Sequence, residues 1–403
     1  MKSEGETASL HAQTKAHGMD GLLVEADWPA LTLQEVREVA SSYAECGEPI
    51  CIESVSPRPF SAASVVSTGG ERVFMKRHHR AVRDTEGLLE EHRFVEHLRM
   101  RGACVPRVLR TNSGATVVER GEWTYEVHEV PDGVDAYEDA ISWTPFRCSG
   151  HAREAGAALA RLHLAAAEYE VPARRPRPLV ASFSIFASED PAAAMEEYLA
   201  ARPALHRDAA TRRRCEEAVD LLRPFHEELL PLLPALKPLW THNDLHASNL
   251  FWSDAGVHAR ATAVIDFGLS DRTNAMVDLA QAIERNLVEW LTLVNDSAHP
   301  ERVRVHLDQL HALLEGYESV RTMTREERSA LAPMTALCHA EFALTEADYF
   351  LGVLHSPEKA AMATDGYLLG HARWFRGPGA KLLDAIRRWA DDHENAYTGG
   401  LGR

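Results

Sequence analysis

The first third of the chain alternates between two hydrophobic patterns. Two stretches carry apolar side chains at helical spacing and end near a glycine, which is a common helix stop. Between and after them lie short β-favouring runs separated by turn-forming residues. The helical stretches are 31–47 and 85–102, and the runs are 49–55, 61–68, 71–78, 116–121 and 122–130. This order predicts an antiparallel sheet with a helix inserted in it, and a turn at Gly69 and Gly70.

Helical spacing dominates beyond the turn-forming "PDG" at 131–133. Two short apolar segments, 238–242 and 261–265, interrupt it. The main helical stretches are 152–167, 212–233, 278–294 and 304–320. We therefore expect an α+β protein with two lobes: a polar leader over 1–30, an N-terminal sheet lobe over 31–131 and a mainly helical C-terminal lobe over 132–403.

Composition narrows the class of function. The 403 residues include 43 Lys plus Arg and 60 Asp plus Glu, a formal charge of −17, which argues against nucleic-acid binding. The excess of acidic over basic residues favours solubility and, more weakly, a cationic substrate. The six cysteines show no C-x-x-C pair and read as reduced core thiols. With no signal-peptide pattern and no long apolar span, we expect a cytoplasmic protein that does not bind membranes.

Two polar clusters follow the short apolar segments. "LWTHNDLHASNLFW" at 239–252 contains Asp244 and Asn249, and "ATAVIDFGLSD" at 261–271 contains Asp266. They supply one carboxylate that can take a proton, together with an amide oxygen and a second carboxylate that suit Mg²⁺. Phosphoryl transfer from a nucleotide needs these parts and a cation on the phosphates. Lys76, in a strand-like run, could be that cation, with Glu91 of the next helix as its partner and Glu90 as the less favoured candidate.

"HNDLHASN" followed by "IDFG" resembles the phosphotransfer loop and metal-binding segment of the aminoglycoside phosphotransferase and choline kinase-like family, relatives of the protein kinases. The resemblance covers roughly residues 32–375 and implies a two-lobed protein-kinase-like fold. It also implies an ATP-dependent and Mg²⁺-dependent enzyme that phosphorylates a hydroxyl group of a small polar molecule, such as an aminoglycoside, a sugar, choline or a homoserine-like metabolite. Oligomeric state and the choice between ATP and GTP stay open.

The resemblance also assigns roles position by position. Asp244 would be the catalytic base, with His246 near the γ-phosphate. His242 would buttress the metal-binding aspartate, and Asp278 would be structural. The remaining implied residues are Mg²⁺ ligands Asn249 and Asp266, phosphate lysine Lys76 and its partner Glu91, and an adenine-reading hinge with backbone groups around His128 to Val130.

Two departures from the family pattern concern loops. Asn243 stands where the small-molecule kinases of the family usually have glycine, and Asn tolerates the left-handed conformation that such a position needs. The turn at 56–64 lacks the G-x-G-x-x-G of protein kinases, which lowers the expectation of a protein kinase more than that of a kinase.

Alternative functions stay open beside the small-molecule kinase. They are a protein Ser/Thr kinase, a nucleotide-binding scaffold without activity, and a zinc hydrolase in which His242, Asp244 and His246 bind the metal. Two charged stretches are interpreted as solvated: the basic run at 76–83 and the acids of helix 340–350. Those acids, Glu341, Glu346 and Asp348, are kept as secondary candidates for the acceptor pocket. Trp240 and Trp252 are expected in the core.

Overall fold

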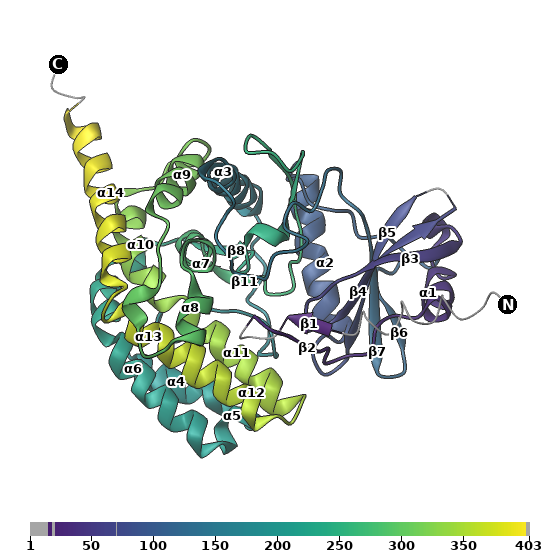
Figure 1. Cartoon of the computed structure of the whole chain (residues 1–403), viewed down its shortest axis with the longest axis horizontal. Helices are drawn as coiled ribbons and strands as arrows, with labels where there is room; N and C mark the ends of the chain where they lie inside the picture. The colour runs from purple at the N-terminus through teal and green to yellow at the C-terminus, as the bar shows by residue number, and fades with distance from the viewer. Residues whose placement is uncertain (1–14, 18–20, 70, 400–403) are drawn as a thin grey trace. The chain divides into compact units, whose positions relative to one another are not determined.

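The computed structural model describes residues 15–17, 21–69 and 71–399, which form two compact units (Figure 1). The first unit contains the chain up to Met100 together with Cys104–Asp132. The second contains Arg101–Ala103 and the chain from Gly133 onward.

The first unit is built on a five-stranded antiparallel sheet with the strand order β3-β4-β5-β7-β6. Two helices and a short strand pair complete it. The elements are β1 (Lys15–His17), β2 (Leu23–Glu25), α1 (Leu33–Ala40), β3 (Pro49–Val55), β4 (Ala62–Thr68), β5 (Arg72–His79), α2 (Thr85–Met100), β6 (Val118–Arg120) and β7 (Trp123–Glu129). The predicted strands and the helix between them are therefore present. The β1–β2 pair was not predicted, and residues 1–14 and 18–20 of the proposed leader, like Gly70 of the proposed turn, lie outside the described residues.

Successive side chains of β5 and β7 point to opposite sides of the sheet, so its two faces carry different residues. One face carries Val73, Met75 and Val127, which join the apolar core formed with α1. The other carries Lys76 and Glu126, which lie directly opposite each other in the β5–β7 register and so point the same way. This second face is turned toward α2.

Helix α1 shows how local signals set the boundaries. Thr32 and Glu35 form a capping box at its start. The helix ends at Ala40, earlier than the pattern predicted, and a 3₁₀ turn at Ala44–Cys46 follows. Gly47 then has a φ of 68°, a conformation that glycine adopts without steric cost.

The second unit is mainly helical (Figure 1). Its described residues also form two short antiparallel strand pairs, β8 with β11 and β9 with β10. The strands are β8 (Pro238–Thr241), β9 (Leu250–Trp252), β10 (Ala261–Val264) and β11 (Asp271–Asn274). The helices are α3 (Ser149–Ala166), α4 (Pro191–Ala200), α5 (Pro203–Arg207), α6 (Ala209–Leu229), α7 (Ala275–Leu287), α8 (Trp290–Asn295), α9 (Leu307–Glu318), α10 (Arg325–Leu337), α11 (His339–Gly352), α12 (Pro357–Ala361), α13 (Gly370–Phe375) and α14 (Ala380–Gly399).

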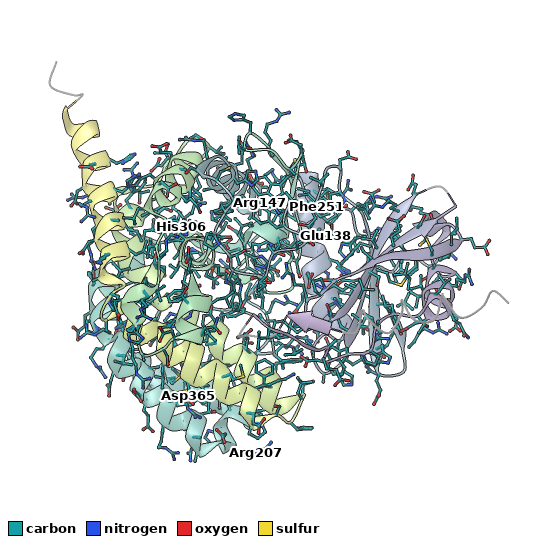
Figure 2. All side chains as sticks on the ribbon, in the orientation of Figure 1. Glu138, Arg147, Arg207, Phe251, His306 and Asp365 are labelled. Carbon is teal, nitrogen blue, oxygen red and sulfur yellow. The ribbon has the colours of Figure 1, made fainter. Side chains whose placement is uncertain are left out.

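Helix α7 is the centre of the second unit, since every one of its residues is buried. The pattern predicted one helix over 278–294, but the structure breaks it between α7 and α8, where Val288 forms an isolated bridge with Val305. An example of an exposed charged residue of this unit is Asp365, labelled in Figure 2, which pairs with Arg214.

The expected burial of the basic run and of the cysteines needs correction, whereas that of Trp240 and Trp252 is confirmed. The run at 76–83 is only partly solvated, because Arg77, His78 and Arg83 are buried, whereas Arg80 is exposed as expected. Only half of the cysteines are core thiols: Cys46, Cys215 and Cys338 are buried, Cys148 is intermediate, and Cys51 and Cys104 are exposed. Trp240 and Trp252 are buried as predicted.

The acids of α11 are also buried, with Glu341, Glu346 and Asp348 exposed by 2%, 1% and 7%. The interpretation as a solvated face was wrong because α11 is packed on all sides by the unit's other helices. None of the described helices is long and apolar enough to cross a membrane.

Candidate active site

The loop between β8 and β9 holds Asp244 on a sharply turned backbone. Asn243 has a φ of 60°, the left-handed conformation that the sequence predicted it could tolerate. Its side chain is fully used: Nδ2 donates to the carbonyl oxygen of Ala181 at 2.9 Å, and Oδ1 accepts from the Thr241 hydroxyl at 2.8 Å. The turn is thus fixed by the Asn243 side chain, which glycine could not do.

Asp278, in the first turn of α7, anchors the same loop. Its carboxylate accepts the backbone N–H groups of His242 at 2.8 Å and Asn243 at 2.9 Å, and Nε2 of His163 donates to it at 3.1 Å. Burial by itself would raise the pKa of Asp278, but the hydrogen bond and charge of His163, with a contribution from His242, hold it below its ordinary value. This geometry agrees with the structural role expected for Asp278.

His242 links the loop to the segment that carries Asp266. Burial lowers the pKa of its imidazole, so the neutral ring has one donor and one acceptor nitrogen. Nδ1 accepts the backbone N–H of Asp244 at 3.1 Å, and Nε2 lies 2.9 Å from the carbonyl oxygen of Ile265, to which it donates. Both nitrogens are therefore occupied, which removes His242 from the zinc-ligand set of the hydrolase alternative.

The carboxylate of Asp244 is paired with Arg285 of α7, through Nη1 and Oδ1. Arg285 is 1% exposed, and its guanidinium lies 4.2 Å from the centre of the Phe342 ring. His246, the other proposed catalytic residue, is also close, with Nε2 3.8 Å from Oδ1 of Asp244. Asp244 keeps partial access to solvent, since its side chain is 16% exposed.

Asn249 and Asp266 lie at neighbouring ends of two paired strands. The backbone N–H of Ile265 donates to the carbonyl of Asn249 at 3.0 Å, which places Asp266 one residue beyond that contact. Nδ2 of Asn249 donates to the backbone oxygen of Asp244 at 2.9 Å, so the amide oxygen is the atom left to bind a metal. Asp266 has a φ of 62°, an unfavourable conformation for aspartate and one that tends to occur at functional sites.

The proposed nucleotide residues all lie in the first unit. Lys76 is half-buried in β5, and Glu91 of α2 is 4% exposed, whereas Glu90 is only half-buried. Of the proposed hinge, His128 belongs to β7, and Val130 follows the end of that strand. The pairing of Lys76 with Glu91 and the adenine contacts at His128 to Val130 stay predictions.

The buried acids of α11 have two different environments. Glu341 accepts hydrogen bonds from the hydroxyl groups of Ser182 and Ser184 and from the backbone N–H of Ile185. Oε2 of Glu346 has no hydrogen-bond partner among the described residues, and burial raises the pKa of this carboxyl to about 8. Glu346 is therefore mostly protonated at neutral pH.

Sequence reasoning missed two residues of α7 that position the loop. They are Arg285, which pairs with Asp244, and Asn286, whose side chain accepts the N–H of Ala247 at 2.9 Å and donates to the carbonyl of Leu245 at 2.9 Å. The signal was available, because Asp278 and Arg285 are seven residues apart and hence on one face of the helix. A charged side chain that becomes buried needs a partner.

Comparison with known proteins agrees with this architecture. A family model described as the phosphotransferase enzyme family matches residues 60–323. The match spans more than half of the chain, so the protein belongs to this family and is a phosphotransferase, as the resemblance implied. No curated protein matches the sequence.

Solved structures share the fold at low sequence identity. A microcompartment-associated aminopropanol kinase has 17% identity and a TM-score of 0.55, over 86% of this chain and 98% of that one. A choline/ethanolamine kinase family protein from Mesorhizobium loti has 14% identity and a TM-score of 0.51, over 89% and 100%. The amicoumacin kinase hAmiN, solved with AMP-PNP, Ca²⁺ and amicoumacin, has 14% identity and a TM-score of 0.51, over 84% and 93%. The expected α+β, kinase-like fold is thereby confirmed.

Proposed function

We propose that this phosphotransferase is an ATP-dependent kinase that transfers the γ-phosphate to a hydroxyl group of a small polar molecule. The observation that carries the proposal is the loop at 241–249. Arg285 of α7 pairs with Asp244, Asn286 of α7 accepts the N–H of Ala247, and Asn249 donates to Asp244. Phosphoryl transfer requires a rigidly placed base and a metal-binding oxygen, because positioning and charge stabilisation supply most of the rate enhancement.

In the proposed reaction the acceptor hydroxyl oxygen attacks the γ-phosphorus, the bond to the β,γ-bridging oxygen breaks, and ADP leaves. Asp244 orients the hydroxyl and takes its proton through the carboxylate oxygen that Arg285 does not occupy. Lys76 would hold the phosphates of the nucleotide, with Glu91 as its partner, and His246 would lie near the γ-phosphate. The backbone around His128 to Val130 would contact adenine.

The residues present also fit a hard divalent cation. The free amide oxygen of Asn249 and the carboxylate of Asp266 are the oxygen ligands that Mg²⁺ prefers. When bound, Mg²⁺ would neutralise charge on the phosphates.

The acceptor would bind beside Asp244, where aromatic and carboxyl groups of the second unit converge. Trp143 stacks on Tyr367 with ring centres 5.4 Å apart, and Arg285 lies between Asp244 and the rings of Trp143 and Phe342. The indole N–H of Trp143 and Oε2 of Glu346 both lack hydrogen-bond partners among the described residues. Unpaired polar groups close to Arg285 support a polar acceptor in this part of the unit.

Calorimetric titration with ATP, with and without Mg²⁺, tests the nucleotide part of the proposal. Wild type should bind ATP in a Mg²⁺-dependent way, and Asp266→Ala should weaken that binding. The matched control is Asp254→Ala, which removes an exposed carboxylate from the turn between β9 and β10 and should bind like wild type. Folded wild type that binds no nucleotide would contradict the proposal and favour the scaffold alternative.

The chemical step is tested with Asp244→Ala. Once an acceptor has been found by screening hydroxyl compounds for a mass increase of one phosphoryl group, this variant should lower turnover on the order of 10²- to 10⁴-fold while ATP binding persists. Wild-type turnover in Asp244→Ala would refute the base assignment. Labelling of a generic protein by ATP, without labelling of small acceptors, would instead favour the protein kinase alternative.

A further inference from the structure

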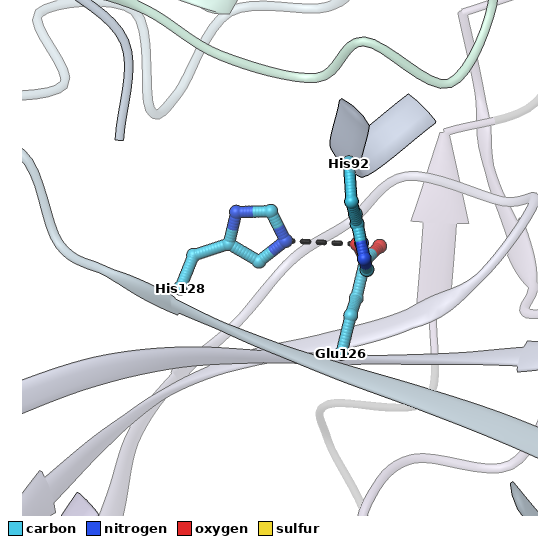
Figure 3. A group of neighbouring side chains, drawn as sticks. All are labelled: His92, Glu126 and His128. Atoms are coloured by element: carbon cyan, nitrogen blue, oxygen red, sulfur yellow. Dashed lines mark hydrogen bonds and ion pairs between the residues drawn. The ribbon is translucent and has the colours of Figure 1, made fainter. Parts of the chain in front are cut away.

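Four titratable side chains meet inside the first unit, on the sheet face that is turned toward α2. His78 comes from β5, His92 from α2, and Glu126 and His128 from β7. Figure 3 shows the last three of these side chains. His78, His92 and Glu126 are 6%, 4% and 1% exposed, and the side chain of His128 is 14% exposed. The function proposed above uses none of these side chains.

The imidazoles surround the carboxylate of Glu126 from three directions. Nε2 of His92 lies 2.7 Å from Oε2, Nε2 of His128 lies 2.8 Å from the same oxygen, and Nε2 of His78 lies 2.8 Å from Oε1. The ligand atoms of His92, Glu126 and His128 all lie within 4.8 Å of one another. Within the ranges that the structure describes, this is the one group of three or more His, Cys, Asp or Glu side chains close enough to share a metal ion.

A second layer of polar groups fixes two of these three side chains. Nδ1 of His92 is 2.8 Å from the hydroxyl of Thr116, which can accept its proton and leave Nε2 unprotonated. His78 can donate to Oε1 of Glu126 and leave Oε2 available. Metal-binding histidines and carboxylates usually have such hydrogen-bond partners, which set the ring tautomer and orient the ligand.

The fold itself does not require this cluster. A sheet face that packs against a helix is ordinarily apolar, and a buried ionic group is seldom more stabilising than apolar residues of similar volume. Two imidazole nitrogens beside a carboxylate oxygen are instead ligand types that bind a transition metal ion.

We propose that His92, Glu126 and His128 form a zinc site that ties α2 to β7. Two imidazole nitrogens and one carboxylate oxygen are a common zinc-ligand set, with bonds of about 2.0–2.2 Å. In a tetrahedral site such bonds separate the ligand atoms by roughly 3.3–3.6 Å. The nitrogen–oxygen distances of 2.7 and 2.8 Å must therefore open by less than about 1 Å, which small side-chain rotations allow.

The site differs in chemistry from the one at Asn249 and Asp266. Mg²⁺ prefers oxygen ligands alone, whereas imidazole nitrogen favours zinc and other transition metals. The expected effect is structural, since the ion would fix the helix that carries Glu91 to the strand that leads into the proposed hinge.

The test is a zinc titration of the full chain after removal of metal by a chelator. A chromophoric chelator competes for Zn²⁺, and Co²⁺ serves as a spectroscopic probe of ligand geometry. We expect one Zn²⁺ per chain and a Co²⁺ spectrum of the tetrahedral type. Thr116→Val, which keeps the shape of the side chain and removes the hydroxyl, should weaken binding about 10- to 100-fold. His128→Gln removes a ligand and should weaken binding more than Thr116→Val does.

The matched control is His97→Gln, which removes another histidine of α2 outside the cluster and should leave affinity and stoichiometry unchanged. Equal zinc affinity in wild type, Thr116→Val and His128→Gln would show binding to surface histidines only and would overturn the proposal. Absence of zinc binding by folded wild type would overturn it too, and would identify the cluster as a closed hydrogen-bond network. If circular dichroism shows that His128→Gln is unfolded, Thr116→Val decides the outcome.

Discussion

Replacing Asp278 with asparagine should strongly destabilise the second unit, although the two side chains are nearly equal in size. The carboxylate accepts hydrogen bonds from His242, Asn243 and His163, and it is completely buried. Asparagine keeps one oxygen and replaces the other with an NH₂ group, which must then face an N–H donor. One hydrogen bond to a charged acceptor is lost, at about 1.5–3 kcal/mol, and one buried donor is left unpaired, at about 1–3 kcal/mol. The expected loss in free energy of unfolding is therefore roughly 2.5–6 kcal/mol.

The assay is urea unfolding followed by tryptophan fluorescence, because Trp240 and Trp252 flank the loop and are 1% and 0% exposed. The matched control is Gln281→Leu, one turn further along α7. Neither side-chain polar atom of Gln281 has a hydrogen-bond partner among the described residues, so this change should be neutral or stabilising. A free energy of unfolding for Asp278→Asn within about 1 kcal/mol of wild type would refute the reasoning, since the lost hydrogen bond alone should exceed that.

Acid titration gives a second test of the same carboxylate. The folded-state pKa of Asp278 is lowered, so its stabilising contribution is present above the unfolded pKa of about 3.8 and is lost as pH falls through the lower folded value. Between these two pKa values, the stability of Asp278→Asn should depend less on pH than that of wild type. An identical pH dependence in both proteins would contradict the assigned ionisation.

Two further predictions concern the surroundings of Asp244. Arg285→Leu should reduce turnover about 100-fold, because a misplacement of the base by about 1 Å has an effect of that size. The ATP affinity of this variant, measured by calorimetry, should not change. Unchanged turnover would show that Arg285 does not position Asp244. Glu346→Gln should remove a pH dependence of stability. In wild type the folded-state pKa of Glu346 is raised from 4.5 to about 8, so between these pH values the folded state holds a proton that the unfolded state has lost. The free energy of unfolding of wild type should therefore fall there by up to about 1.4 kcal/mol per pH unit. Unfolding at pH 5 and pH 8 checks this, and an equal decrease in Glu346→Gln would assign the effect to another group.

The sequence was most informative where a short segment decides its own structure. The strand runs at 49–55 and 71–78 and the helix at 85–102 were found close to their observed positions, because hydrophobic period and flanking glycines are local signals. The left-handed Asn243 was likewise foreseeable from residue type. Boundaries were less certain where packing intervenes, as at Val288, whose bridge with Val305 divides α7 from α8.

Burial of charged residues was the main failure of the sequence analysis. Glu341 and Glu346 look like the polar face of an amphipathic helix, yet both are buried, because residues distant in the chain cover that face. The same holds for His78 in the basic run at 76–83. A one-dimensional pattern reports which side chains share a face, but not whether another element covers it.

The sequence by itself determined the order of elements, the kinase-like class and the candidate residues Asp244, Asn249 and Asp266, since each depends on local period or on a contiguous motif. Only the tertiary structure decided which distant groups act on them. Asp278 and Arg285 contact the loop at 242–244 across more than thirty positions of the chain, and His78 of β5 and His92 of α2 converge on Glu126 of β7. Such contacts are set by the packing of whole helices and strands, which no short segment of sequence encodes.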